Sequence, residues 1–170
     1  MTEELPHTTI SSADGFEIRQ YPDHVLAQVQ VTGDFMSAGN RAFGPLVRFI
    51  GGNNQSNTSI AMTAPVLQES PTEKTHTVSF VLPVGMDASS VPVPSNAQVH
   101  IVHVPSKRVA VRPFGGGWKA SRFEANRDAL LDAVAKAGLT TTGHPYFARF
   151  DPPWRPPFLK RNEVLIDLAD

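Results

Sequence analysis

The segment from Asp151 to Arg161 brings aromatic rings and positive charges together within one short stretch. Trp154 and Phe158 offer apolar ring faces. The positive charges come from Arg155, Lys160 and Arg161. An arginine fork can donate two parallel charge-assisted hydrogen bonds to one carboxylate, and four prolines stiffen the segment so that it loses less entropy on ordering. Such a loop suits a flat apolar molecule that carries carboxylates at one edge.

Other chemistry is not favoured by the spacing of the residues that could perform it. His100 and His103 lie three apart on an expected strand and therefore face opposite ways. His144 is the best placed of the six histidines, but the sequence assigns it no ligand role. Gly115–Gly117 has no following Lys-Ser/Thr and is typical of a turn. No nucleophile elbow or fixed carboxylate pair is present, so we expect no catalytic residue and no metal ligand.

Composition excludes several classes of protein. The chain of 170 residues has no cysteine, which removes disulfides, thiolate metal sites and iron–sulfur clusters. Its formal charge of −1 and scattered basic residues predict neither a nucleic-acid partner nor a polybasic membrane anchor. The polar Met1–His7 does not resemble a secretory signal, and no apolar run approaches the ~20 residues that span a bilayer. We therefore expect a cytoplasmic protein.

The first half of the chain predicts two strands, a helix and two more strands. The strands are expected at 16–21, 25–31, 60–68 and 77–82, from alternation and β-branched residues. The helix is expected between the second and third of these strands and should kink at Pro45. Gly51 is the expected residue after its end. Its predicted apolar stripe comprises Met36, Phe43, Leu46, Val47 and Ile50.

After a connector rich in proline and glycine at 83–97, the same order of elements recurs. Strands are expected at 99–104, 109–114, 146–150 and 163–168. The helix should begin with a capping box, Ser121-x-x-Glu124, and end near Gly138. Its predicted apolar stripe comprises Phe123, Leu130, Val134 and Ala137.

The distances between matching elements are nearly constant. Met62–Val66 and Tyr146–Phe150 are 84 residues apart, and Ile50 and Ala137 are 87 apart. Although any α+β chain can be cut into two similar strings, the agreement favours two ββαββ repeats, at about 16–82 and 98–168. Because neither repeat can cover its own sheet, we expect one shared core and a single domain over 1–170, with a flexible terminus at 1–14.

Six motifs occur in the order and roughly the spacing of a known family, over about residues 15 to 168. They are Phe16-Glu-Ile-Arg-x-Tyr21, Phe43-x-x-Leu46-x-x-Phe49-Ile50-x-Gly52-x-Asn54, Ile60-Ala-Met-Thr-Ala-Pro-Val66, Phe80-x-Leu82-Pro83, Phe114-x-Gly116-x-Trp118, and Tyr146-x-Ala-Arg-Phe-Asp-Pro-Pro-Trp-Arg-Pro156 with Arg161-Asn-Glu163. The chain thereby resembles the SOUL/haem-binding-protein family. The resemblance implies an α+β fold, a distorted antiparallel β-barrel of two pseudo-two-fold ββαββ repeats with one helix on each side.

The resemblance also implies a site for haem or another tetrapyrrole, held non-covalently between the first helix and the loop before the last strand. By position this implies Val47 and Arg48 on the helix, and Trp154, Arg155 and the neighbouring Phe158 in the loop. Phe43 and Leu46 would line its floor if that face of the helix turns outward, and are core otherwise. The alternatives are solvated surface charge for the two arginines and a packing role for Trp154. Some relatives carry histidine where this chain has Gln20, so ligation of iron by that route is not available.

The function implied is reversible capture of a tetrapyrrole for buffering, transport or delivery. One alternative is an enzyme that modifies or demetallates the bound tetrapyrrole. Another, from the related GyrI-like fold, is a sensor of a different small amphipathic ligand or of a protein partner. Protein partners cannot be inferred from the sequence.

Overall fold

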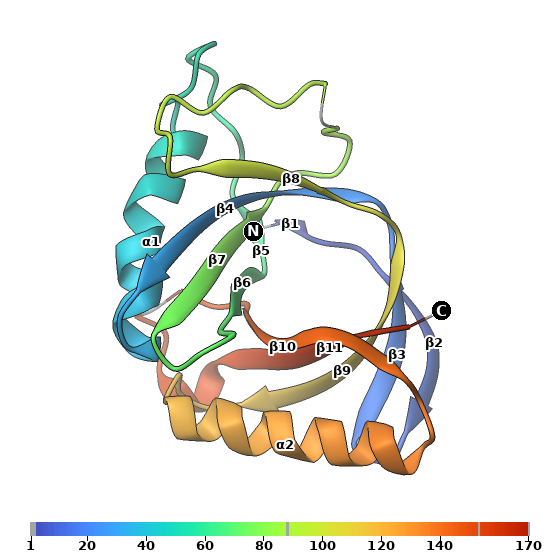
Figure 1. Ribbon diagram of the computed structural model, residues 1–170. Coiled ribbons are helices and arrows are strands. Elements are labelled where there is room, and N and C mark those ends of the chain that lie inside the picture. Colours follow the sequence, from blue (N-terminus) through green and yellow to red (C-terminus); the bar gives the residue numbers. More distant parts are fainter. Residues whose placement is uncertain (1–2, 88, 153, 170) are drawn as a thin grey trace. The chain divides into compact units, whose positions relative to one another are not determined.

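The computed structural model describes residues 3–87, 89–152 and 154–169. By its internal contacts the chain forms two compact units, Met1–Leu5 with Asp23–Pro105 and Pro6–Pro22 with Ser106–Asp170. Each unit contains antiparallel strands and one long helix (Figure 1). The predicted α+β class with two ββαββ repeats is therefore confirmed. No helix among the described residues is long and apolar enough to cross a membrane.

The first unit is a four-stranded antiparallel sheet covered by one helix. Its elements are β1 (Glu3–Glu4), β4 (His24–Thr32), α1 (Phe35–Ile50), β5 (Thr63–Ala64), β6 (Val66–Glu69), β7 (Thr75–Val81) and β8 (His100–Val104). The strand order is β6-β7-β4-β8, and the short β1 pairs with β5 in parallel. Helix α1 packs on β4 and β7 (Figure 1).

Local chemistry explains where α1 begins and ends. The carboxylate of Asp34 accepts a hydrogen bond of 2.7 Å from the backbone N–H of Ser37, as an N-cap residue does. The helix continues through Pro45, where we expected a kink, and ends before Gly51. Ala42, Leu46 and Phe49 are buried in one cluster with apolar residues of β4 and β7.

The second unit is a five-stranded antiparallel sheet with its own helix. Its elements are β2 (Thr8–Ala13), β3 (Phe16–Tyr21), β9 (Lys107–Gly115), α2 (Ala120–Lys136), β10 (Thr141–Arg149), the 3₁₀ turn η1 (Pro157–Leu159) and β11 (Arg161–Leu168). The strand order is β2-β3-β9-β11-β10. Helix α2 packs on β9 and β11 and buries Phe123, Leu130 and Val134, as its stripe predicts.

Four local expectations were wrong. Residues 8–13 form β2 rather than a flexible terminus; all six side chains are exposed, so pairing with β3 through the backbone leaves no apolar pattern. The capping box does not form, because α2 begins at Ala120 and Ser121 already lies in its first turn. Ala137 is exposed at the helix end. The strand expected at 60–68 is divided into β5 and β6 around Pro65, which has no N–H to donate.

The two repeats exchange their first strands. The repeats are β3-β4-α1-β6-β7 and β8-β9-α2-β10-β11, and their helices begin 85 residues apart, at Phe35 and Ala120. Strand β3, however, pairs with β9 of the second repeat, and β8 pairs with β4 of the first. Each compact unit is therefore completed by a strand from the other half of the sequence. That both units make a single domain stays a prediction.

Truncating the α2 core should destabilise the fold. Leu130 is fully buried, so Leu130→Ala should lower the free energy of unfolding by about 2–5 kcal/mol. Val84→Ala removes an exposed side chain and should change it by less than about 0.5 kcal/mol. Denaturant unfolding followed by circular dichroism measures both. A Leu130→Ala protein as stable as its parent would contradict the assignment of this helix face to the core.

Candidate functional site

One face of α1 is apolar and exposed. Met36, Phe43 and Val47 expose 50%, 43% and 38% of their surface, and their spacing of seven and four residues places them on one side of the helix. Leu46 and Ile50 lie on the buried side instead. The residues predicted to form one apolar stripe on α1 therefore divide between two faces, one exposed and one buried. Small residues, Ala38 and Ala42 among them, fill much of the buried face, which lets larger apolar residues remain outside.

A glycine interrupts this exposed face beside a cation. Gly44 follows Phe43, and a Cβ atom at its position would lie 3.4 Å from the Nη1 atom of Arg48. The guanidinium of Arg48 therefore lies over helix backbone that no side chain covers. Glycine inside a helix costs roughly 0.5–1 kcal/mol relative to alanine. We refer to Met36, Phe43, Gly44, Val47 and Arg48 as the α1 outer face.

Phe43 and Leu46, both predicted to line the floor of a site, are placed differently. The ring of Phe43 meets that of Phe80 edge-on at 5.5 Å between centroids, so it is held from one side and exposed on the other. Leu46 is completely buried and takes the core role that was its alternative. A ligand on the α1 outer face would contact Phe43 but not Leu46.

In the second unit, the 151–161 loop carries the most exposed aromatic residues described. Trp154 and Phe158 expose 79% and 82% of their surface, and Leu159 is also exposed. Arg155 Nη1 lies 3.0 Å from Asp151 Oδ1, while the other oxygen of Asp151 accepts from the backbone N–H of Arg161. Asp151 thus holds the two ends of the loop together. The rings of Trp154 and Phe158 between them are exposed to solvent.

The other cations predicted for this loop lie over aromatic rings at its base. Lys160 Nζ is 3.8 Å from the ring centroid of Trp118, and the guanidinium of Arg149 is 5.0 Å from it. Arg161 lies 4.1 Å over Phe150. Burial lowers the pKa of Arg149 to about 10, so it stays charged at neutral pH. The role of Trp118 was missed, although it was recognised as part of a family motif.

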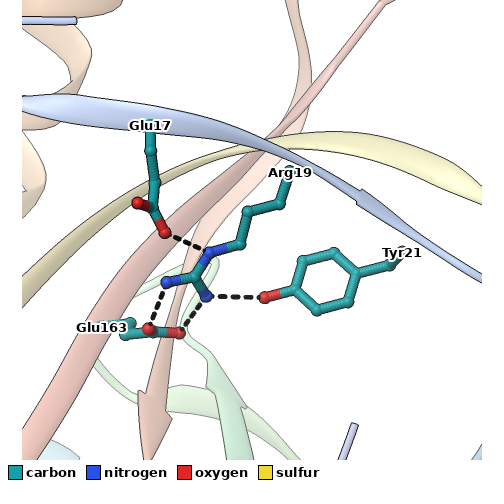
Figure 2. A network of polar contacts seen from close by, with 4 residues as sticks. All are labelled: Glu17, Arg19, Tyr21 and Glu163. Carbon is teal, nitrogen blue, oxygen red and sulfur yellow. Dashed lines mark hydrogen bonds and ion pairs between the residues drawn. The ribbon is translucent and has the colours of Figure 1, made fainter. Parts of the chain in front are cut away.

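The strongest polar network in the second unit surrounds Arg19 (Figure 2). Its Nη1 and Nη2 atoms donate to the two carboxylate oxygens of Glu163 at 2.9 and 2.8 Å. Nη1 also donates to the Tyr21 hydroxyl at 2.9 Å, and Nε donates to Glu17. Burial by itself would lower the pKa of Arg19, but its contacts with Glu163 and Tyr21 together more than offset burial, and the pKa is raised.

This network closes on itself and therefore has a structural role. Arg19 and Glu163 are both buried, and a buried guanidinium needs such pairing to offset its desolvation. The signal in the sequence was the recurrence of Glu17, Arg19 and Tyr21 at every second position of a strand. The alternation of apolar and polar residues in this strand was interpreted as a half-buried strand with its polar side in solvent. In the structure these polar side chains instead contact one another and Glu163.

The described residues offer no site for a metal ion. No group of three or more histidine, aspartate or glutamate side chains gathers among them. His76 is buried, with its ring nitrogens 2.7 Å from Ser70 Oγ and 2.9 Å from the Gly33 carbonyl. His144 is exposed on β10, and neither α1 nor the 151–161 loop contains a histidine. Both surfaces therefore combine apolar side chains with arginine and contain no histidine.

Comparison with known sequences finds one family over nearly the whole chain. Residues 2–167 match the family described as SOUL heme-binding protein. The chain is 28% identical to heme-binding protein 1 of Xenopus tropicalis, over 88% of this chain and 81% of that protein. It is also 28% identical to heme-binding protein 1 of Mus musculus, over 88% and 82%.

Comparison with solved structures supports the fold. The C-terminal domain of EcmrR matches with a TM-score of 0.68 at 12% identity, over 91% of this chain and 97% of that one. A structure described as a hydrolase from Listeria innocua matches with a TM-score of 0.61 at 12% identity, over 94% of each chain. At such low identity these likenesses concern the fold alone.

Breaking the buried ion pair should be costly. Glu163→Gln leaves the charge of Arg19 without its carboxylate and should lower the free energy of unfolding by about 3–5 kcal/mol. Asp132→Asn breaks the exposed pair with Lys136 and should cost less than about 1 kcal/mol. Urea unfolding of both variants measures the difference. Equal, small losses would contradict a structural role for the pair.

Tyr21 should titrate at unusually high pH. Burial raises its pKa, and the hydrogen bond from Arg19 offsets this only in part. The folded protein then keeps a proton that the unfolded chain loses near pH 10, so the stabilisation is complete below about pH 10 and declines above it. Because the chain has two tyrosines, phenolate absorbance of Tyr146→Phe reports Tyr21 alone. Ionisation at about pH 10 in the folded variant would contradict this.

Proposed function

This chain belongs to the SOUL heme-binding protein family, and we propose that it binds haem or a related tetrapyrrole non-covalently, for buffering, transport or delivery. The observation that carries the proposal is the α1 outer face, where exposed apolar side chains adjoin uncovered backbone and an arginine. The names of the relatives in Xenopus tropicalis and Mus musculus support the same ligand. The chain has no cysteine, which is compatible with a ligand held without a covalent bond.

The α1 outer face fits the chemistry of a tetrapyrrole. The ligand is a flat apolar ring with carboxylates at one edge. Phe43 and Val47 supply apolar contact, and Gly44 has no side chain, so a flat ring can approach the helix there once the Arg48 guanidinium turns from the glycine to a propionate. Arg48 can donate charge-assisted hydrogen bonds to a propionate. Exposing a cluster of apolar side chains to water costs free energy, and such clusters commonly mark a binding surface.

The 151–161 loop of the second unit is a further candidate binding surface for the tetrapyrrole, and its variants are tested separately from those of α1. Trp154 and Phe158 present ring faces on which a porphyrin can stack. Arg155 is paired with Asp151 but keeps 44% of its side chain exposed, so a propionate can share its remaining N–H groups. In this proposal Trp154 contacts the ring, and Arg155 a carboxylate.

Bound haem would supply an iron centre, and the proposed contacts supply no ligand to it. Neither the α1 outer face nor the 151–161 loop contains histidine or tyrosine. The side chains of these segments bind the ring and the propionates and shield the ring from water. Affinity should therefore depend on the organic ring more than on its metal.

A haem titration followed by difference absorbance tests the function. We expect a saturable shift of the Soret band at one haem per chain, and comparable affinity for iron-free protoporphyrin. His144→Ala should leave the Soret position unchanged. Failure to saturate would overturn the proposal, and loss of the Soret shift in His144→Ala would show that the iron has a protein ligand.

Variants of the two surfaces should separate their contributions. Arg48→Ala and Arg155→Ala, made singly, should each weaken haem by up to roughly ten-fold to a hundred-fold, since each charge-assisted bond contributes about 1.5–3 kcal/mol, less where water screens it. Trp154→Ala should weaken it through lost stacking. Gly44→Leu should weaken it about ten-fold or more by placing a side chain between the ring and the helix, whereas Ala135→Leu, on an exposed position of α2, should not. Parental affinity in both single arginine variants would refute the propionate contacts.

A further inference from the structure

Strand β4 extends beyond the strand that covers one of its edges. Strand β8 pairs with β4 from His24 as far as Gln28, opposite His100. On the other side, β7 follows β4 to Thr32, opposite Thr75. Over Val29–Thr32, β4 therefore has a neighbouring strand on one side only among the described residues. A partly open edge of this kind can accept a further strand.

The backbone of this segment is turned so that it can accept one. The N–H of Gly33 donates to the carbonyl of Lys74 at the β7 side. Since successive residues of a strand direct their backbone groups to opposite edges, Thr32 and Gln30 direct theirs to the open edge. In agreement, the carbonyl of Thr32 accepts a hydrogen bond from the guanidinium of Arg41 on α1.

A groove of about 690 Å³ is lined by this end of β4 and by its neighbour β7. Its residues are Val29–Thr32 of β4, Thr75–Thr77 of β7, Pro71 and Gln98. Arg41 and Pro45 line it from the helix. Arg41 and Pro45 are four residues apart and share a side of α1, away from Phe43 and Val47 but next to Gly44 and Arg48, so the groove borders the polar margin of the α1 outer face and not its apolar side chains.

We propose that this groove binds an extended peptide with an acidic side chain, which adds a strand to the open edge of β4. The backbone N–H and C=O groups of Gln30 and Thr32 would pair with the peptide, as in other cases of β-strand addition. Arg41 selects the carboxylate, because its planar fork binds carboxylates in pairs of hydrogen bonds.

Arg41 then has two states. Without a peptide it covers the Thr32 carbonyl, which protects the edge from indiscriminate pairing. With a peptide it turns to the carboxylate and releases that carbonyl to the added strand. Asp34, whose charge lies near Arg41, is engaged by hydrogen bonds from Ser37 at the start of the helix. The exchange makes binding selective for acidic sequences.

Fluorescence anisotropy with two labelled hexapeptides tests the proposal. Both alternate valine and threonine, and one carries a central glutamate where the other carries lysine. The glutamate peptide should bind saturably and about ten-fold or more tightly than the lysine peptide. Arg41→Ala should remove this preference, whereas Arg127→Ala, which removes an arginine from α2, should retain it. Equal affinity of the parent protein for both peptides, or no binding of the glutamate peptide, would overturn the proposal.

Two measurements locate the peptide. In the parent protein, amide chemical shifts should change at Gln30, Thr32 and their neighbours. Gln30→Pro removes an N–H on the open edge without removing a bond to β7, and should abolish binding while the far-ultraviolet circular dichroism is unchanged. If that variant does not fold, the chemical shifts of the parent decide the location. Shifts confined to other residues, or a dimer of this chain that occupies the edge in sedimentation experiments, would refute it.

Discussion

The bidentate contact between Arg19 and Glu163 is the interaction on which the arrangement of the second unit depends. Strand β3 comes from the beginning of the chain and β11 from its end, and this pair joins them across the intervening β9. A slip of β3 by one residue would move Arg19 to the opposite face of the sheet and leave two buried charges without partners. The ion pair therefore specifies the register of an exchanged strand, which backbone pairing alone would specify weakly.

Helix α1 combines three surfaces, and their separation follows from side-chain size. Ala42 and its neighbours let the helix lie close to the sheet, so that only Leu46, Phe49 and Ile50 are needed as large core residues. The remaining apolar side chains are then free to form the α1 outer face. Arg41, next to Gly44 and Arg48 on the helix, meets the edge of β4. One short helix thus serves the core, an exposed apolar face and the edge of a strand.

Most of the elements could be predicted from the sequence, because alternation and helical spacing are local. Phe123, Leu130 and Val134 were assigned to the core on that basis, and the structure confirms them. Which side of α1 faces the sheet could not be predicted, since Phe43 and Leu46 belong to one broad apolar arc and only packing distinguishes them. The ion pair of Arg19 joins residues far apart in the sequence, so no local pattern indicates it. Strand β2 has only exposed side chains and leaves no apolar signal at all. Trp154 and Phe158 were named as candidate contacts from the sequence, with packing as the alternative for Trp154, whereas their exposure and the ring contacts of Lys160 and Arg161 needed the structure.

The exchange of first strands bears on how such a chain could have arisen. A chain of only one repeat would lack a strand that its own sheet requires. It could complete that sheet only by receiving the strand from a second copy and giving its own in return, as swapped dimers do. Fusion of two copies turns this exchange between molecules into one within a single chain, where the partner strand is always present at high effective concentration. In such a fusion the connector of residues 83–97, which lies between the two repeats, would be the junction of the two copies.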